Sequence, residues 1–365
     1  MESAVTDILR KTPLYDTHAT MGAKMAPFGG WLMPIQYDGI LTEHAHTRAK
    51  VSVFDICHMG EFILEADPVS SGLDRIVTQD IISMPIGSCR YGFILNEEGG
   101  VLDDLVMYRT GDLEWMAVVN AATVQSDEKH FLKNLRGKYS FKNVSDSLGK
   151  LDIQGPLSGE ALTKIFGPEI ARLSYYAFDR FELWGEKCLV SRTGYTGELG
   201  YEVYISAGNV VKLWKKLLED GRMKPAGLGS RDTLRLEMGY PLYGQDLDKA
   251  HTPLEAGFER FVDLSKDFIG KSALLAKKSD GLKENLIYFK ADSRRSPRHG
   301  FGIYDGVVRV GTVTSGSFAP SLSAGIGMGY VHGKIETGTR LIVRDQSTEI
   351  PVTTVKRPFY KKPAI

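Results

Sequence analysis

The sequence predicts an α+β fold in which strands and helices alternate through about residue 280, followed by a smaller unit rich in β-structure. With 365 residues the chain is long enough for two or three domains, since a domain typically holds roughly 100–200 residues. In the first part, apolar residues at helical spacing repeatedly follow strand-like runs. From Asn285 onward the helical period disappears. We therefore expect one region over residues 1–284 and a second domain over residues 285–365.

The expected helices are amphipathic, and each one follows a strand candidate. The first begins at Asp67, a good N-cap residue, with Pro68 at the first helical position and apolar residues at helical spacing up to Val77. Further apolar faces comprise Val124, Phe131, Leu132 and Leu135; Leu157, Ala161, Leu162, Ile165 and Phe166; and Val210, Trp214, Leu217 and Leu218. Strands are expected at Glu61–Glu65, Leu105–Arg109, Trp115–Asn120, Tyr139–Val144, Leu151–Gln154, Lys187–Ser191 and Tyr201–Ser206. The similar patterns of Gly60–Val77 and Gly200–Leu218 hint at a duplicated half.

The C-terminal part consists of short β-rich runs separated by Gly-containing turns, which is typical of a small sandwich or barrel. These runs are Asn285–Lys290, Val307–Thr314, Gly325–Val331, Arg340–Val343 and Ile350–Lys356. The polar stretch Lys277–Lys283 carries a turn signal and is the expected linker.

Composition excludes several classes of protein. The 45 Lys and Arg balance 45 Asp and Glu, so the chain lacks the field of a general nucleic-acid or membrane-surface binder. No apolar run approaches the ~20 residues that span a bilayer. The start, Met1–Arg10, has no apolar core of signal-peptide length, and the three cysteines are too few for a disulfide framework. We expect a cytoplasmic protein, or the mature form of one from the mitochondrial matrix, that binds neither nucleic acid nor membrane.

Several common catalytic and cofactor motifs do not fit. Ala324–Gly329 has the wrong spacing for a dinucleotide fingerprint and opens no helix, so its glycines are expected to permit bulges or close backbone approach. His44 and His46 point to different faces of a helix and are expected to face solvent, and no metal site is predicted. His58 is expected to be a hydrogen-bonded structural residue. Neither a P-loop nor a G-x-S-x-G elbow is present.

The segment Asn96–Leu105 combines a Gly-Gly turn with the adjacent carboxylates Asp103 and Asp104 at the start of a strand. Neighbouring residues of a strand point to opposite faces, so one carboxylate is expected to enter the interior or a cavity. There it could accept a proton or stabilise a developing cation. An Asp pair that caps the turn is the alternative.

The segment Ser191–Glu202 has glycines at every third position, interleaved with Tyr195, Glu198 and Tyr201. Backbone can approach a ligand closely here, tyrosine can stack on a planar heterocycle, and an ionised Glu can accept paired N–H bonds from an amino-pyrimidine edge. A hairpin with exposed polar residues is the alternative.

The segment Ala226–Glu237 places a Gly-rich turn and Ser230, as N-cap, before a helix that carries Arg231 and Arg235 one turn apart. A helix N-terminus with a guanidinium suits a carboxylate. An intrahelical pair of Arg235 with Asp232 is the alternative.

Taken together, an ordered series of motifs resembles the glycine cleavage system T-protein family over nearly the whole chain. The series is Thr12–Tyr15, Phe28–Trp31, Asp55–Glu61, Asn96–Asp104, Ser191–Glu202, Ala226–Glu237, Tyr243–Asp246, Thr314–Pro320 and Lys356–Tyr360. A mild departure is Cys57, where the family more often has Ser beside the His.

The resemblance implies a three-lobed molecule, with two interleaved α+β lobes in residues 1–284 and a small barrel-like C-terminal domain, around a central opening for folate. It implies an aminomethyltransferase that acts on the lipoyl arm of the H-protein, with tetrahydrofolate as the acceptor and co-substrate. Carried over residue by residue, it makes Asp104 the catalytic carboxylate, which orients the folate nitrogen and stabilises positive charge; whether it also takes the proton stays open. The residues implied for folate or substrate binding are Tyr195, Glu202, Arg231, Tyr240 and Tyr360.

Two rival functions share the resemblance. A folate-dependent demethylase would keep the fold but use another donor, and the paired Asp103-Asp104 with the intact Arg231 segment favours the aminomethyl donor. A non-enzymatic folate-binding assembly factor would carry Cys before the hairpin tyrosine and Gln at the hairpin's end, where this chain has Gly194 and Glu198. For docking of the H-protein, the basic stretch Arg294–His299 is one candidate, and a solvated turn is the alternative.

Overall fold

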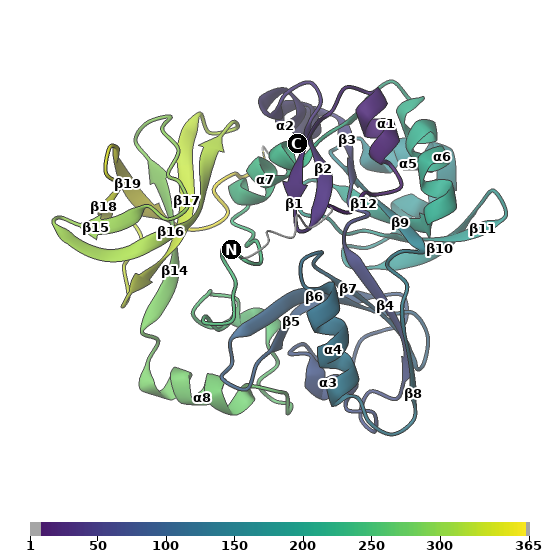
Figure 1. The fold of residues 1–365 in the computed structure, drawn as a ribbon, viewed down its shortest axis with the longest axis horizontal. Helices are drawn as coiled ribbons and strands as arrows, with labels where there is room; N and C mark the ends of the chain where they lie inside the picture. Colours follow the sequence, from purple (N-terminus) through teal and green to yellow (C-terminus); the bar gives the residue numbers. More distant parts are fainter. Residues whose placement is uncertain (1–8, 363–365) are drawn as a thin grey trace, which may run out of the picture.

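The computed structural model describes residues 9–362 of the chain. Two large β-sheets, a two-stranded sheet and a closed barrel organise these residues into three lobes (Figure 1). The expected α+β fold with a C-terminal barrel is therefore confirmed. Residues 1–8 lie outside the described residues, so the expectation that Met1–Arg10 holds no signal peptide is not tested.

The first lobe is built on a six-stranded mixed sheet in the order β10-β11-β12-β9-β3-β13, in which only β13 and β3 run parallel. Helices α5 and α6 bury apolar faces in its core, as their spacing predicts. The strands are β3 (Val51–Asp55), β9 (Leu148–Gln154), β10 (Phe178–Leu183), β11 (Glu186–Ser191), β12 (Gly200–Ser206) and β13 (Met223–Pro225). The helices are α1 (Tyr15–Thr20), α2 (Ile40–Ala49), α5 (Ser158–Phe166), η1 (Pro168–Arg172), α6 (Ala207–Leu218) and α7 (Leu228–Glu237), and β1 (Lys24–Phe28) with β2 (Trp31–Gln36) forms a hairpin.

The second lobe is built on a five-stranded antiparallel sheet in the order β5-β6-β7-β4-β8. Its strands are β4 (Gly60–Ala66), β5 (Cys89–Leu95), β6 (Val101–Arg109), β7 (Glu114–Val119) and β8 (Tyr139–Asn143), with helices α3 (Leu73–Ile76) and α4 (Val124–Asn134). The helix expected from Asp67 is reduced to the single turn α3. Asp67 accepts hydrogen bonds from the backbone and hydroxyl of Ser70, and Gly72 has a φ of +73°, so the segment before α3 forms a turn. Because β4 lacks the long helix that follows β12, the suggested repeat is not supported here.

The C-terminal lobe is a closed barrel in the order β14-β17-β16-β15-β18-β19, at the left of Figure 1. Its strands are β14 (Glu284–Ala291), β15 (Gly302–Asp305), β16 (Val308–Ala319), β17 (Ala324–His332), β18 (Arg340–Arg344) and β19 (Glu349–Val355). The expectation about the glycines of β17 is confirmed: a Cβ at Gly327 would lie 2.6 Å from the Phe289 ring and one at Gly329 would lie 2.4 Å from the Thr312 carbonyl.

The segment before the barrel differs from the expected linker. Helix α8 (Lys271–Asp280), preceded by η2 (Glu259–Phe261), includes Lys277 to Asp280, so the connection to β14 shortens to residues 281–283. Gly281, with a φ of +84°, follows the helix directly. Within residues 9–362, no helix is long and apolar enough to cross a bilayer.

Candidate active site

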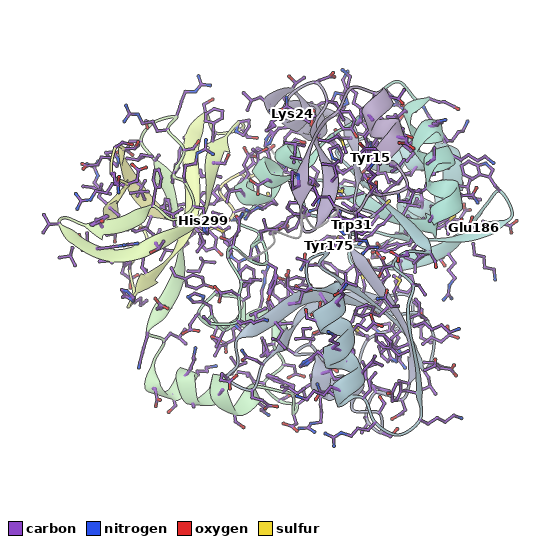
Figure 2. The ribbon with its side chains drawn as sticks, viewed as in Figure 1. Tyr15, Lys24, Trp31, Tyr175, Glu186 and His299 are labelled. Atoms are coloured by element: carbon purple, nitrogen blue, oxygen red, sulfur yellow. The ribbon has the colours of Figure 1, made fainter. Side chains whose placement is uncertain are left out.

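A cavity of about 750 Å³ is lined by residues of both sheets, by the loops after α7 and around η2, and by Arg357 after the last barrel strand. The sheets contribute charged and aromatic side chains, and the hairpin β1–β2 contributes Phe28. Figure 2 labels Tyr175, a residue of the cavity wall, near the middle of the molecule. The volume suits a small organic molecule of several rings.

Asp104 lies on β6 and lines this cavity. Its Oδ2 accepts a hydrogen bond from the Tyr91 hydroxyl (2.8 Å), and its Oδ1 accepts one from the side-chain amide of Asn120 (2.9 Å). Burial, and then the negative charge of Asp103, raise the pKa of Asp104 to about 7. A carboxyl group in this range can hold or release a proton at neutral pH.

Asp103 points to the other side of β6 and is fully buried. It accepts hydrogen bonds from the Asn120 backbone (2.9 Å), the Asn120 amide (2.8 Å) and the Thr123 hydroxyl (2.8 Å). The expectation that the two carboxylates face opposite ways is confirmed, since Asp104 lines the cavity and Asp103 does not. The turn-capping alternative is wrong: the Gly-Gly turn is held by Asn96, whose Oδ1 accepts a hydrogen bond from the Gly100 backbone (2.7 Å), whereas Asp103 bonds Asn120 and Thr123. Burial and the charge of Asp103 raise the pKa of nearby Asp127 to about 10, which favours the protonated form of Asp127 at neutral pH.

Glu202 reaches the cavity from β12 of the other sheet and is mostly buried. Its Oε2 accepts a hydrogen bond from the Thr193 hydroxyl (2.6 Å), which itself lies 2.7 Å from Ser191 Oγ. One carboxylate oxygen is thus held in place by the protein, while Oε1 lies 3.9 Å from the ammonium of Lys150. The carboxylate presents acceptor positions to the cavity.

Tyr195, Tyr240 and Arg231 form one aromatic and cationic group on the cavity wall. The rings of Tyr195 and Tyr240 lie 5.9 Å apart at 27°, and the Arg231 guanidinium lies 4.6 Å from the Tyr195 ring centre. The Tyr195 hydroxyl donates to the carbonyl of Pro241, which fixes the ring. A planar heterocycle can stack against such a group.

Tyr360 is the predicted site residue that the structure places apart from this cavity. The Arg48 guanidinium lies 4.4 Å from the centre of its ring, and its backbone nitrogen donates to the Glu237 carbonyl (3.0 Å). Its ring therefore packs on an arginine whose guanidinium also forms ion pairs with the carboxylates of Glu198 and Glu237, each at an N–O distance of 2.8 Å.

Comparison with known proteins agrees with this arrangement. The model of the GCVT N-terminal domain matches residues 14–266, and that of the glycine cleavage T-protein C-terminal barrel domain matches residues 285–361. The chain belongs to the glycine cleavage T-protein family. It is 40% identical over 357 residues to an aminomethyltransferase of Pseudothermotoga lettingae, covering 97% of this chain and 98% of that one. It is 42% identical over 356 residues to one of Halothermothrix orenii, covering 96% and 100%.

A solved structure of a T-protein has the same fold. The glycine cleavage system aminomethyltransferase T from Bartonella henselae matches with a TM-score of 0.90 and 33% sequence identity, covering 97% of this chain and 98% of that one. The three-lobed arrangement expected from the resemblance is therefore shared by an independent member of the T-protein family.

The N-terminus of α7 differs from the expectation for this T-protein. Ser230 is not the N-cap: it lies inside the helix, and its hydroxyl donates to the Gly227 carbonyl (2.9 Å). The expected anion at the helix start is supplied by the protein itself, because Glu43 Oε2 accepts a hydrogen bond from the Gly227 backbone (2.8 Å). Arg235 is buried and pairs with Asp232 (2.8 Å), which is the alternative that the sequence left open, and with Asp246.

The histidines also differ from the expectations. His44 is buried, and its ring bonds the hydroxyls of Thr233 (2.8 Å) and Ser321 (3.1 Å), so the solvent-facing assignment is wrong. His46 is half-buried and bonds the carbonyls of Val51 and Arg222. Within residues 9–362, no group of three His, Cys, Asp or Glu side chains is arranged to hold a metal ion.

His58 lies on the cavity wall, edge-on to Phe28. Its Nδ1 is buried without a hydrogen-bond partner among the described residues, so the expected structural hydrogen bond is not made by that atom. Burial lowers the pKa of His58 to about 3. The ring is therefore neutral at physiological pH.

The polar residues of the site that sequence reasoning missed include Tyr91, Asn120 and Lys150. Tyr91 lies on β5 and Asn120 directly follows β7, the two strands that flank β6 in the sheet, and no local spacing marks either residue. The sequence did mark Lys150, because it lies next to Leu151 in a strand that is buried on both faces, and a lysine is rare in such a strand.

Proposed function

We propose that this T-protein transfers the aminomethyl carbon of an S-aminomethyl-dihydrolipoyl H-protein to tetrahydrofolate. The carbon leaves sulfur and nitrogen and becomes the methylene bridge between two folate nitrogens, giving 5,10-methylenetetrahydrofolate. The two N–H protons of the folate pass to the products, ammonia and the dihydrolipoyl thiol. The observation that carries the proposal is a single cavity with Asp104 on one sheet and Glu202 on the other.

Glu202, Tyr195 and Tyr240 would hold the pterin. Glu202 would accept hydrogen bonds from the amino-pyrimidine edge, and its orientation is already fixed by Thr193 (2.6 Å). Such charge-assisted bonds contribute roughly 1.5–3 kcal/mol. Arg231, over the Tyr195 ring, adds a cation to the same wall.

Asp104 would act on the reacting nitrogen. Capture of the carbon passes through positive charge on the attacking amine, and an ionised carboxylate in a partly dehydrated cavity stabilises that charge. Because its pKa is raised to about 7, Asp104 can also accept the proton at neutral pH. Tyr91 and Asn120 hold its two oxygens in place.

The H-protein would bring its lipoyl arm to the same cavity. The exposed residues Arg294, Arg295 and Arg298 form a basic stretch on the barrel lobe, and this surface is one place where an acidic partner would bind. His299, labelled in Figure 2, is anchored there by a hydrogen bond to the Thr314 carbonyl (2.7 Å). We place the protein in the cytoplasm, or in the mitochondrial matrix as a mature form, together with that partner.

The test is release of ammonia from aminomethylated H-protein with and without tetrahydrofolate. We expect release to depend strongly on folate, with one methylene group transferred for each ammonia. Release that is equally fast without folate would contradict the proposal. Turnover of an N-methyl donor in place of aminomethylated H-protein would favour the demethylase, and folate binding without turnover of either donor would favour the assembly factor.

A further inference from the structure

Lys150 is a buried lysine whose ammonium group meets no oxygen acceptor within the described part of the chain. The residue is 1% exposed, and its Nζ contacts Met59 Sδ at 3.7 Å. The nearest carboxylate oxygen, Glu202 Oε1, lies 3.9 Å away, beyond hydrogen-bond distance. Tyr204, its cross-strand partner on β12, places its ring centre 4.8 Å from Nζ. An ammonium has three donors, and a thioether is a weak acceptor, so the group is poorly satisfied by the protein alone.

Burying such a charge is costly unless it gains hydrogen bonds and an opposite charge. Other carboxyl groups nearby compensate Lys150 only in part, since burial raises the pKa of Glu61 to about 8 and that of Asp152 to about 7. Lys150 and Glu202 both line the cavity. The β9–β12 register makes them diagonal neighbours on one face, because Lys150 pairs with Tyr204 and Asp152 pairs with Glu202. The wall therefore presents a cationic donor directly beside an anionic acceptor.

This pairing matches one edge of a 4-oxo-pterin, where the C4 carbonyl oxygen is an acceptor and the adjacent N3–H and 2-amino group are donors. We infer that Lys150 is a specificity residue that donates to the C4 carbonyl while Glu202 accepts from N3–H and the 2-amino group. The inference rests on the proposed function, because it concerns the same folate. It assigns to Lys150 the selection of 4-oxo over 4-amino pterins.

The experiment is a binding titration with two probes, tetrahydrofolate and tetrahydroaminopterin, in which an amino group replaces the C4 carbonyl. The proteins are the wild type, Lys150→Met and the control Lys187→Met, which removes an exposed lysine of β11. We expect Lys150→Met to bind tetrahydrofolate at least tenfold more weakly and to change its affinity for the 4-amino probe less than threefold. Lys187→Met should match the wild type with both probes. N3 carries a proton only in the 4-oxo probe, but that difference is the same in all three proteins.

An equal loss of affinity for both probes in Lys150→Met, or no loss for either, would overturn the inference. A lysine that only supports the fold or the charge of Glu202 does not distinguish a carbonyl from an amino group at C4. If Lys150→Met does not fold, the wild type still decides: it must bind tetrahydrofolate at least tenfold more tightly than the 4-amino probe, and equal affinities refute the role. A wild type that does not bind tetrahydrofolate at all removes the proposed function too. A wild type that binds it and turns over, with a preference unchanged in Lys150→Met, removes only the role of Lys150.

Discussion

Asn120 holds Asp104 through its side-chain amide, whose nitrogen lies 2.9 Å from Oδ1 of that carboxylate. The same nitrogen lies 2.8 Å from Oδ1 of Asp103. One amide therefore fixes a carboxylate that faces the interior and one that faces the cavity. The two carboxylates repel each other, and the charge of Asp103 raises the pKa of Asp104. The shared amide keeps both groups in place against this repulsion.

Replacement of the carboxylate tests the catalytic role. We expect Asp104→Asn to lower turnover about 10²–10⁴-fold, the usual range for loss of an acid–base group, because the amide neither accepts the proton nor stabilises positive charge. Turnover is measured as folate-dependent release of ammonia, with the fold checked by circular dichroism. Asp112→Asn, at an exposed position of the same lobe, is the control. Near-normal turnover in a well-folded Asp104→Asn would refute the assignment.

The pH profile tests the environment of Asp104. Since the ionised form is the active one, kcat/KM should fall as the pH drops through about 7. The Tyr91 hydroxyl stabilises the ionised carboxylate and lowers its pKa, so Tyr91→Phe should raise the pKa. We expect the acidic limb of the profile to move up by roughly 0.5–1 pH unit, the equivalent of one hydrogen bond. A limb that stays in place, or moves to lower pH, would show that another group controls it.

Glu202 is expected to act in binding more than in stability. We predict that Glu202→Gln weakens tetrahydrofolate binding by roughly 1.5–3 kcal/mol, measured by titration, while the unfolding midpoint stays close to that of the wild type. Glu198→Gln is the matched control on the same hairpin: it removes ion pairs with Arg48 (2.8 Å) and Lys362 (2.9 Å) outside the large cavity. The control should lower stability and leave folate affinity unchanged. The opposite pattern would exchange the roles of the two glutamates.

Local patterns predicted the elements whose packing follows from their own sequence. Helices α5 and α6 were found because their apolar residues recur at helical spacing and are buried on one side. Helix α4 was found in the same way, and Phe131 is buried, but Leu132 of its expected apolar face is exposed. The opposite orientations of Asp103 and Asp104 followed from strand geometry alone. The family resemblance added the positions of Glu202, Tyr195 and Arg231, which lie together on the cavity wall.

What failed depended on partners distant in the chain. Ser230 looks like an N-cap, yet the start of α7 is satisfied by Glu43, 184 residues from Gly227 in sequence. His44 looks like a surface residue of α2 until the barrel loop brings Ser321 to it. Hydrophobic periodicity describes a single helix or strand and does not show which other element packs against it. These contacts could therefore not be predicted from the sequence pattern.

Glu61 gives the last prediction, which concerns stability and pH. The side chain is buried on β4, its Oε1 has no hydrogen-bond partner among the described residues, and burial raises its pKa to about 8. Between pH 4.5, the ordinary pKa of a Glu side chain, and pH 8, the folded protein keeps a proton that the unfolded chain releases. The contribution of Glu61 to stability is therefore complete below about pH 4.5 and is lost as the pH rises through 8.

The Glu61→Gln variant tests this, because its amide cannot titrate. Its free energy of unfolding relative to the wild type should rise from pH 5 to pH 8.5, by up to about 1.4 kcal/mol per pKa unit. Urea unfolding at both pH values measures this, with Glu65→Gln, at an exposed position of the same strand, as the control. A difference between Glu61→Gln and wild type that is the same at both pH values would mean that Glu61 is ionised in the folded protein.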